Sequence, residues 1–359
     1  MPTETQPLSA ARPTVEVDGK VVSSLTDGLS LVRIHEGLET PATLELEVGN
    51  WGTPPAGGSP DFRFLDRREL DFGRKLAVKF GSDTMFEGRI TALEAVFPPG
   101  ESPRLVVLAE DALQALRLAR RTRTFEQKSD ADVLRTIASD HSLQADIDLS
   151  GPTHKVLAQL DQSDLAFARD RVRSVGGELW IEGTKLRVRQ RPGRAQGQAL
   201  TLALNQQLRE LRVRADLAHQ ATAVIATGWN VAGKQAIAER AGDSVLGAES
   251  SGGDTGATLL KRVFGDRPQT VVAGLPSTTG EARDRAAAVF RARARRFVRG
   301  EGVCELDGKV RVGRTVALSG VGAPFAGDYQ LVDVVHRFDA MDGARSEITV
   351  ERAVLKSSS

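Results

Sequence analysis

Alternating apolar and polar residues dominate the first third of the chain and predict β-strands. The segments 29–34 and 43–48 alternate as half-buried strands do. The run Thr14 to Val22 contains Asp18-Gly19, a dipeptide that suits a tight hairpin turn. Strand patterns recur over 75–81, 85–97 and 105–109. Many strands joined by short connections predict a barrel or a sandwich.

The pattern changes after Asp111, where helical and strand periodicities mix. Ser129 and Ser163 stand where N-caps of two helices are expected, and 178–188 reads as a hairpin that turns at Gly183. Strand patterns return from residue 200. They are interrupted by a Gly/Ser-rich stretch, 242–256, that predicts a mobile loop, and by a helix from Thr279 to Val298.

These patterns predict a mainly β fold of the α+β type. It consists of two duplicated, small, tube-type β-barrels, an α+β module between them and a helical insertion. The predicted divisions are a first barrel over 1–118, the α+β module over 119–198, a discontinuous second barrel over 199–232 and 299–355, and a loop and helix insertion over 233–298.

The duplication is predicted from an internal repeat. Two distant segments carry the same residues in the same order once a one-residue slip is allowed. The first segment has Gly73, Arg74, Phe86 and Gly88, and the second has Gly313, Arg314, Phe325 and Gly327. The repeat predicts a strand, a tight turn, a Phe-x-Gly bend and a long strand. A chance likeness of two hairpins is the alternative. With a true duplication, a homotrimer would present six similar barrels around one axis.

Composition narrows the possible partners. The chain has 48 Lys and Arg residues and 47 Asp and Glu residues, so it lacks the excess of basic residues that a protein recognising nucleic acid directly usually has. The single cysteine, Cys304, excludes an internal disulfide and reads as a buried strand residue. The stretch Met1 to Pro13 lacks the features of a secretory signal, and no apolar run is long enough to span a membrane. We therefore expect assembly in the cytoplasm.

Candidate chemistry is sparse. No nucleophile elbow, P-loop or paired metal-ligand motif is present, and the five histidines are widely spaced in the sequence. The carboxylates of Asp130 and Asp132 and of Asp161 and Asp164 are interpreted as negative charges that stabilise the starts of helices. The arginines of 117–123 and 291–299 are interpreted as solvated helix faces. The alternatives are a surface that binds nucleic acid or an acidic partner, and a subunit or partner interface. The sequence predicts no catalytic, cofactor-binding or metal-binding residue and no cofactor, so we expect no enzyme.

Three segments resemble a known family. These are 162–180, with Gln162-Ser163-Asp164-Leu165 and Gly176-Gly177-Glu178-Leu179-Trp180, then Gly228-Trp229-Asn230-Val231, then Tyr329 to Phe338. Together they resemble the phage late control D proteins, the baseplate hubs of contractile tails. That family is related to the N-terminal hub part of type VI secretion spike proteins (VgrG) and to hubs of extracellular contractile injection systems.

The resemblance implies a structural function. It implies a homotrimeric ring that adapts a six-fold inner tube to a three-fold spike, within a phage tail or contractile injection particle. The expected partners are the chain itself, the inner tube protein, other baseplate proteins and a separate spike protein, because the chain ends at Ser359 after its last predicted strand. Two alternatives remain open: a peptidoglycan- or polysaccharide-binding tail protein that reads glycan with 129–188, and a cell-wall hydrolase.

Overall fold

The structure is a computed structural model that describes residues 12–53, 57–194, 198–272 and 275–356. Most of the N-terminal stretch on which the absence of a secretory signal was predicted lies outside these residues. No helix in the described part of the chain has the length and apolar character needed to cross a membrane.

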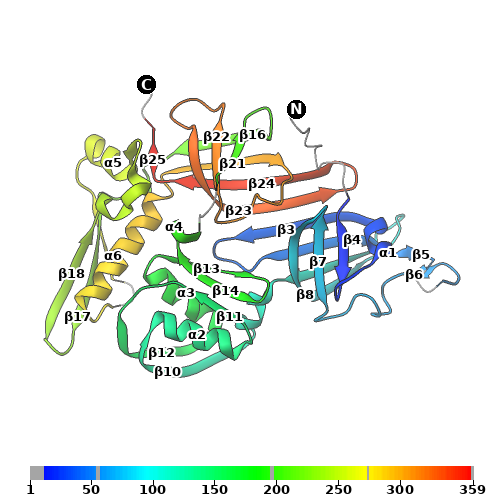
Figure 1. Cartoon of the computed structure of the whole chain (residues 1–359), viewed down its shortest axis with the longest axis horizontal. Coiled ribbons are helices and arrows are strands. Elements are labelled where there is room, and N and C mark those ends of the chain that lie inside the picture. Colours follow the sequence, from blue (N-terminus) through cyan, green and yellow to red (C-terminus); the bar gives the residue numbers. More distant parts are fainter. Residues whose placement is uncertain (1–11, 54–56, 195–197, 273–274, 357–359) are drawn as a thin grey trace.

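The first β-unit is the N-terminal part of the chain (Figure 1). Its predicted Asp18-Gly19 hairpin is confirmed, because β1 and β2 pair on either side of that turn. Its elements are β1 (Thr14–Val17), β2 (Lys20–Val21), α1 (Ser23–Gly28), β3 (Leu29–Gly37), β4 (Thr43–Gly49), β5 (Trp51–Gly52), β6 (Asp61–Phe62), β7 (Lys75–Phe80), β8 (Asp83–Val96) and β9 (Arg104–Glu110).

The second β-unit is assembled from two distant parts of the sequence. Its elements are β15 (Leu200–Ala203), β16 (Leu208–Ala215), β21 (Val298–Glu305), β22 (Thr315–Ser319), β23 (Gly327–Asp339) and β24 (Gly343–Arg352). The short strand β25 (Val354–Leu355) follows them and pairs with β19 (Asp254–Thr255).

Both β-units belong to one 13-stranded sheet, because β3 of the first unit pairs antiparallel with β23 of the second. This junction runs from Leu31 opposite Asp339 to Gly37 opposite Asp333. The mainly β class predicted from the sequence is confirmed. The sequence did not indicate that the two units share a sheet.

The two β-units have the same strand order. The first is ordered β1-β7-β8-β9-β4-β3 and the second β15-β22-β23-β24-β21-β16. The order therefore makes β8 the counterpart of β23 and β3 the counterpart of β16. The outermost pairs differ in direction, since β1 runs antiparallel to β7 and β15 runs parallel to β22.

Hydrogen bonds around the predicted repeat align the two units residue by residue. Gly73 N donates to Ile90 O (2.8 Å) and Ile90 N to Arg74 O (3.0 Å). In the second unit, Gly313 N donates to Leu331 O (2.8 Å) and Leu331 N to Arg314 O (2.9 Å). The register of each long strand then shifts, just after Ile90 and just after Leu331. Ile90 and Leu331 therefore occupy matching places.

This alignment moves the predicted Phe-x-Gly pairs out of register by two residues. Gly88 lies inside β8 opposite Leu76, whereas Gly327 begins β23 opposite Leu318. The residue that matches Gly88 is Tyr329, which lies opposite Val316. Gly88 has its own reason to be glycine, because a Cβ there would lie 2.3 Å from Glu110 O. Phe86 and Phe325 are likewise not equivalent.

The α+β module covers 112–190. Both predicted serine caps are confirmed, with Ser129 accepting from Asp132 N and Ser163 from Ala166 N, and the hairpin at Gly183 joins β13 to β14. The elements are the 3₁₀-helix η2 (Ala112–Arg117), β10 (Arg120–Ser129), α2 (Asp130–Asp140), β11 (Gln144–Ile147), β12 (Thr153–Ser163), α3 (Asp164–Ser174), β13 (Gly177–Glu182) and β14 (Lys185–Gln190). The short helix α4 (Arg191–Arg194) leads out of the module.

The insertion between β16 and β21 has its own sheet, β18-β17-β20, and a long helix that packs on it. Its elements are β17 (Ala223–Asn230), β18 (Gln235–Ala241), η3 (Asp243–Ser250), β19, α5 (Gly256–Phe264), β20 (Pro268–Val271) and α6 (Thr279–Ala294). Two predictions were wrong in detail. The strand at 223–230 belongs to this sheet rather than to the second β-unit, and the stretch predicted as a mobile loop forms 3₁₀ turns.

Four hydrophobic cores correspond to the two β-units, the module and the insertion. The first core also contains Leu306, Phe338 and Ala344 from the second unit. Phe338 is only 5% exposed, and its ring centroid lies 6.3 Å from that of Phe80. The junction between the units is therefore closed by side chains as well as by backbone hydrogen bonds.

We predict that Phe338→Ala lowers the free energy of unfolding by about 3–5 kcal/mol, since it removes a buried aromatic ring from the first core. Phe264→Ala is the control. The Phe264 side chain, at the end of α5, is 57% exposed, so the expected loss is below about 1 kcal/mol. Urea denaturation of the purified variants measures both, and equal losses would contradict the prediction.

Candidate assembly interfaces

The junction between the two β-units is reinforced by polar contacts at the end where β3 finishes. His35 Nε2 lies 2.8 Å from Asp333 Oδ2, across the β3–β23 pair. The Arg311 guanidinium pairs with Glu36 at 2.5 Å, and Arg311 also donates to Met85 O at 3.0 Å. Arg311 thus ties the loop that precedes β22 to two strands of the first unit.

A buried ionic cluster joins the α+β module to the second β-unit. Arg191 Nε lies 2.8 Å from Glu178 Oε1, and Arg191 Nη1 lies 2.7 Å from Glu351 Oε1. Arg194 Nη1 lies 3.2 Å from the other Glu178 oxygen, and its guanidinium stacks over the Trp180 ring at 4.5 Å. Burial raises the pKa of Glu178, but Arg191 and Arg194 outweigh burial and hold it below its usual value. The carboxylate is therefore charged.

A second polar cluster joins the module to the insertion. His154 Nδ1 lies 3.0 Å from Glu281 Oε1, in the first turn of α6, and His154 Nε2 lies 3.4 Å from Asp130 Oδ2. Arg171 from α3 pairs with the other Asp130 oxygen at 2.5 Å. The Asp130 hydrogen bond raises the pKa of His154 against the opposing effect of burial.

The arginines of 117–123 belong largely to strand β10, so the prediction of a solvated helix face was wrong there. Arg123 Nη2 lies 2.8 Å from Asp164 Oδ1, and Arg121 Nε lies 3.3 Å from Asp164 Oδ2. His141 Nε2 completes this cluster, 2.8 Å from the same carboxylate. Asp164 is therefore an ion-pair centre as well as the first residue of α3.

The second arginine stretch is also more buried than predicted. Arg295 is buried and holds Glu249 with two nitrogens at 2.7 Å, while Arg291 donates to Val245 O at 2.8 Å. These arginines fasten α6 to η3. Arg296 and Arg299 remain exposed.

A basic pocket lies between α3, α6 and β23. Arg173 in its wall pairs with Glu39 at 2.5 Å. Arg169 and Arg285 have buried guanidinium nitrogens that find no hydrogen-bond partner among the described residues. Burial lowers the pKa of both side chains. Guanidinium donors of this kind bind carboxylate or phosphate oxygens.

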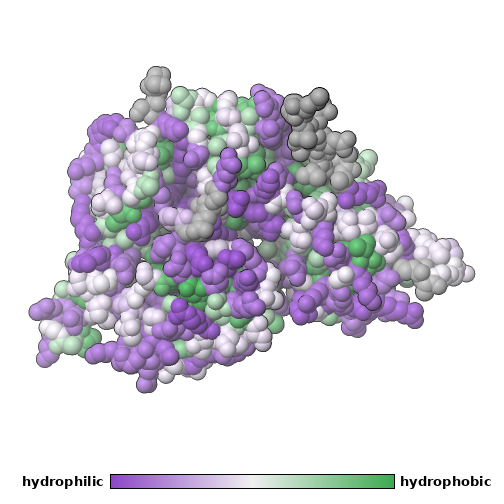
Figure 2. Space-filling view, viewed as in Figure 1, coloured by the Kyte–Doolittle hydropathy of each residue, from purple (hydrophilic) through white to green (hydrophobic). Residues whose placement is uncertain are grey.

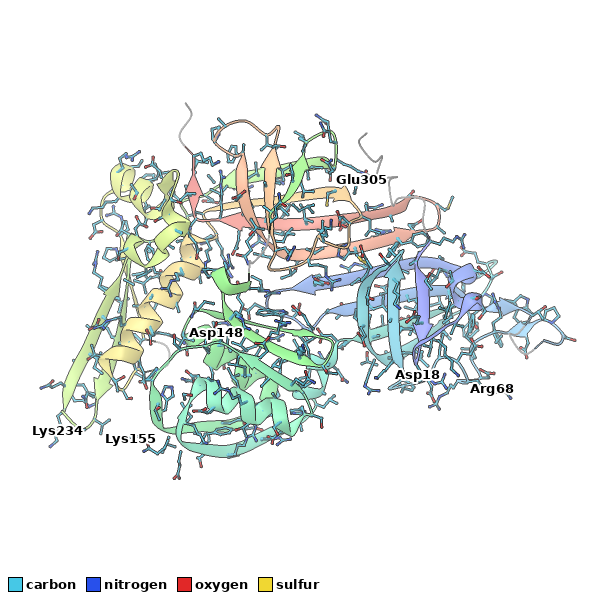
Figure 3. All side chains as sticks on the ribbon, viewed as in Figure 1. Asp18, Arg68, Asp148, Lys155, Lys234 and Glu305 are labelled. Carbon is cyan, nitrogen blue, oxygen red and sulfur yellow. The ribbon has the colours of Figure 1, made fainter. Side chains whose placement is uncertain are left out.

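Exposed aromatic side chains gather at the far end of the first β-unit. Trp51 and Phe62 make an edge contact with ring centroids 5.4 Å apart, and Phe62 makes another with Phe97 at 5.8 Å. Figure 3 labels Arg68 in the same region and Lys234 at the opposite end of the molecule. The face in Figure 2 is mostly hydrophilic, with separate hydrophobic areas. Clustered exposed aromatics are typical of protein interfaces.

The cysteine and the buried histidine of the second β-unit lie in its interior. Cys304 is a buried residue of β21, as predicted, and burial raises the pKa of its thiol to about 12. His336 is buried beside Ser346 Oγ, at 2.9 Å. No group of three or more His, Cys, Asp or Glu that could hold a metal ion occurs within the described ranges. The hypothesis that 129–188 reads glycan stays a prediction.

This architecture defines a class: the fold is that of phage tail proteins. The chain is similar to the 43 kDa tail protein of prophage MuSo2 from Shewanella oneidensis, with 13% identity and a TM-score of 0.71 over 96% of this chain and 99% of that one. It is also similar to a tail protein from Neisseria meningitidis MC58, with 12% identity and a TM-score of 0.65 over 95% and 96% of the two chains.

A component of the type VI secretion system of E. coli has the same fold, with 14% identity and a TM-score of 0.57 over 96% of this chain and 77% of that protein. Residues 11–340 match the family model described as the Alg8 N-terminal domain, and the chain belongs to that family. The search of curated proteins found no match to this chain.

We predict that Glu178→Ala destabilises the protein by about 3–5 kcal/mol, because it leaves the buried Arg194 guanidinium without its carboxylate and removes one of the two partners of Arg191. Glu182→Ala on the same strand removes a partly exposed pair with Arg187 and a hydrogen bond accepted from Trp180 Nε1, and should cost at most about 1 kcal/mol. Thermal and urea unfolding compare the two variants. A loss for Glu178→Ala no larger than for Glu182→Ala would show that the cluster adds little stability.

We also predict a pH dependence from His154. Its pKa is raised in the folded protein, so its stabilising effect is fully present below about pH 6.5 and is lost as the pH rises through the folded-state pKa. Urea unfolding at a series of pH values should show wild-type stability falling over that range relative to His154→Gln. Parallel stability curves for the two proteins would contradict this.

Proposed function

We propose that this chain is a non-enzymatic, structural baseplate hub of a contractile tail or injection system. The observation that carries the proposal is the arrangement of two β-units with one strand order, joined edge to edge in a single sheet. Three copies of such a chain supply six similar units, which suits a ring that contacts a six-fold partner on one side and a three-fold partner on the other.

The fold supports this proposal. Proteins of the same fold include two phage tail proteins and a type VI secretion component. The resemblance of 162–180 and of Tyr329 to Phe338 to the late control D proteins points the same way. In this proposal the partners are further copies of the chain, the inner tube protein, other baseplate proteins and a separate spike protein, in a particle assembled in the cytoplasm.

The polar clusters fit a part that carries mechanical load. The clusters around Glu178 and His154 connect the module to the second β-unit and to the insertion, respectively. Breaking a buried ion pair costs several kcal/mol, so these contacts resist separation of the parts. A hub that is rigid before assembly loses less entropy when it binds its neighbours.

We predict that the purified chain forms a trimer with three times the 38.5 kDa mass of one copy. Light scattering coupled to size exclusion measures the mass, and negative-stain electron microscopy should show rings with an open centre. Exclusively monomeric protein across a wide concentration range, with or without the candidate spike and tube proteins, would overturn the proposal.

A further inference from the structure

Within the described residues, strand β16 has one edge that no other strand pairs with, and only Leu208 at its start forms an isolated bridge, to Leu204. Strand β16 is the terminal strand in the order of the large sheet, and β21 pairs with one of its sides. Its residues alternate, with Leu211 and Val213 half-buried toward the second core and Arg212 and Arg214 exposed on the other face. An uncovered edge of this kind offers a row of backbone donors and acceptors to another strand.

The second half of strand β8 has another unpaired edge within the described residues. Arg89 pairs with β7 on one side and β9 on the other, and from Ala92 to Val96 the pairing continues only with β9. In the described part of the chain no strand pairs with these residues on the side that β7 occupies earlier. Phe97, directly after the strand, is 60% exposed.

These two edges are the counterparts of the two strands that already join the β-units inside one chain. The matching of Ile90 with Leu331 aligns Ala92 with Asp333, and Leu108 and Thr349 lie opposite these two residues in the neighbouring strands. The same ladders continue through Glu45 to Arg33 and through Glu301 to Arg212. Arg212 of β16 therefore corresponds to Arg33 of β3.

The register of the β3–β23 junction can then be transferred to the free edges. Inside the chain, Val335 lies opposite His35, His336 opposite Ile34, and Phe338 opposite Val32. The corresponding pairs between two copies are Glu94 with Arg214, Ala95 with Val213, and Phe97 with Leu211.

The side chains fit this register. Glu94 and Arg214 have opposite charges, both are exposed, and neither has an ion pair within the described residues. Ala95, Val213, Phe97 and Leu211 are apolar. Phe338, the counterpart of Phe97, is 5% exposed because it enters the core of the adjacent β-unit. In a single copy no β-unit of the described chain lies beside this edge, so Phe97 and its aromatic neighbours stay exposed.

We propose that β16 of one copy pairs antiparallel with the second half of β8 of the next copy, with Glu94 opposite Arg214. Each chain offers one edge of each kind, so the contact is head-to-tail and closes into a ring when the third copy returns to the first. This inference rests on the proposed trimer and names the surface that forms it. Every contact between β-units in the ring then follows one pattern, within and between chains.

Disulfide crosslinking tests the register. Directly opposite residues of an antiparallel pair have Cα atoms about 4.5–5.5 Å apart, within the range that a disulfide spans. Full-length protein carrying Ala95→Cys and Val213→Cys should give covalent dimers and trimers under mild oxidation. The control carries Ala95→Cys and Arg209→Cys, shifted by four residues, and should stay uncrosslinked. The native Cys304 is buried and does not interfere.

Charge exchange tests the chemistry. Glu94→Arg and Arg214→Glu each place like charges opposite one another and should weaken trimer assembly by about fivefold per interface. The double exchange restores opposite charges and should return assembly to the wild-type level. Circular dichroism of all three variants should be unchanged, because both positions are exposed.

The outcomes separate this inference from the proposed function. A trimer that crosslinks through 95 and 213, with rescue by the double exchange, supports both. A trimer without that crosslink, or with crosslinking equal to the shifted control, overturns the strand pairing and leaves the hub proposal standing. A chain that stays monomeric overturns both.

Discussion

Backbone hydrogen bonds between β3 and β23 are the interaction on which the rest of this architecture depends. They convert two β-units, separated in sequence by the whole α+β module, into one sheet. The junction sets the angle and the register between the units, and side chains such as Phe338 and Arg311 follow that register. A slip of one residue would turn each inward side chain outward, so the junction has one favourable alignment.

A buried ionic cluster connects the α+β module to this sheet. The module's own core is separate, and the bridge to the second unit passes through Glu178, Arg191 and Glu351. Ion pairs of this kind need specific partner geometry, whereas apolar surfaces tolerate sliding. The position of the module is thereby specified, at the cost of desolvating several charged groups.

Features encoded by neighbouring residues could be predicted from the sequence. The alternation in β4, the caps at Ser129 and Ser163, and the turn at Gly183 are local and were correct. Contacts between distant residues could not be predicted. The sequence around Glu178 gives no sign that Arg191 will bridge it to Glu351. Asp164 was interpreted only as a helix-start charge, because its arginine partners lie some forty residues earlier. The Phe-x-Gly match failed because equal residues suggested an alignment that the hydrogen bonds do not follow.

One difference between the β-units has a further consequence. Five residues, 38–42, connect β3 to β4, whereas the connection between their counterparts β16 and β21 contains the entire insertion with α6. In the proposed ring this makes alternate positions chemically distinct. A protein that recognises the β-units would find six almost equal places, while one that recognises the insertion would find only three. The number of copies of a partner that bind the ring thus depends on whether the partner contacts the β-units or the insertion between β16 and β21.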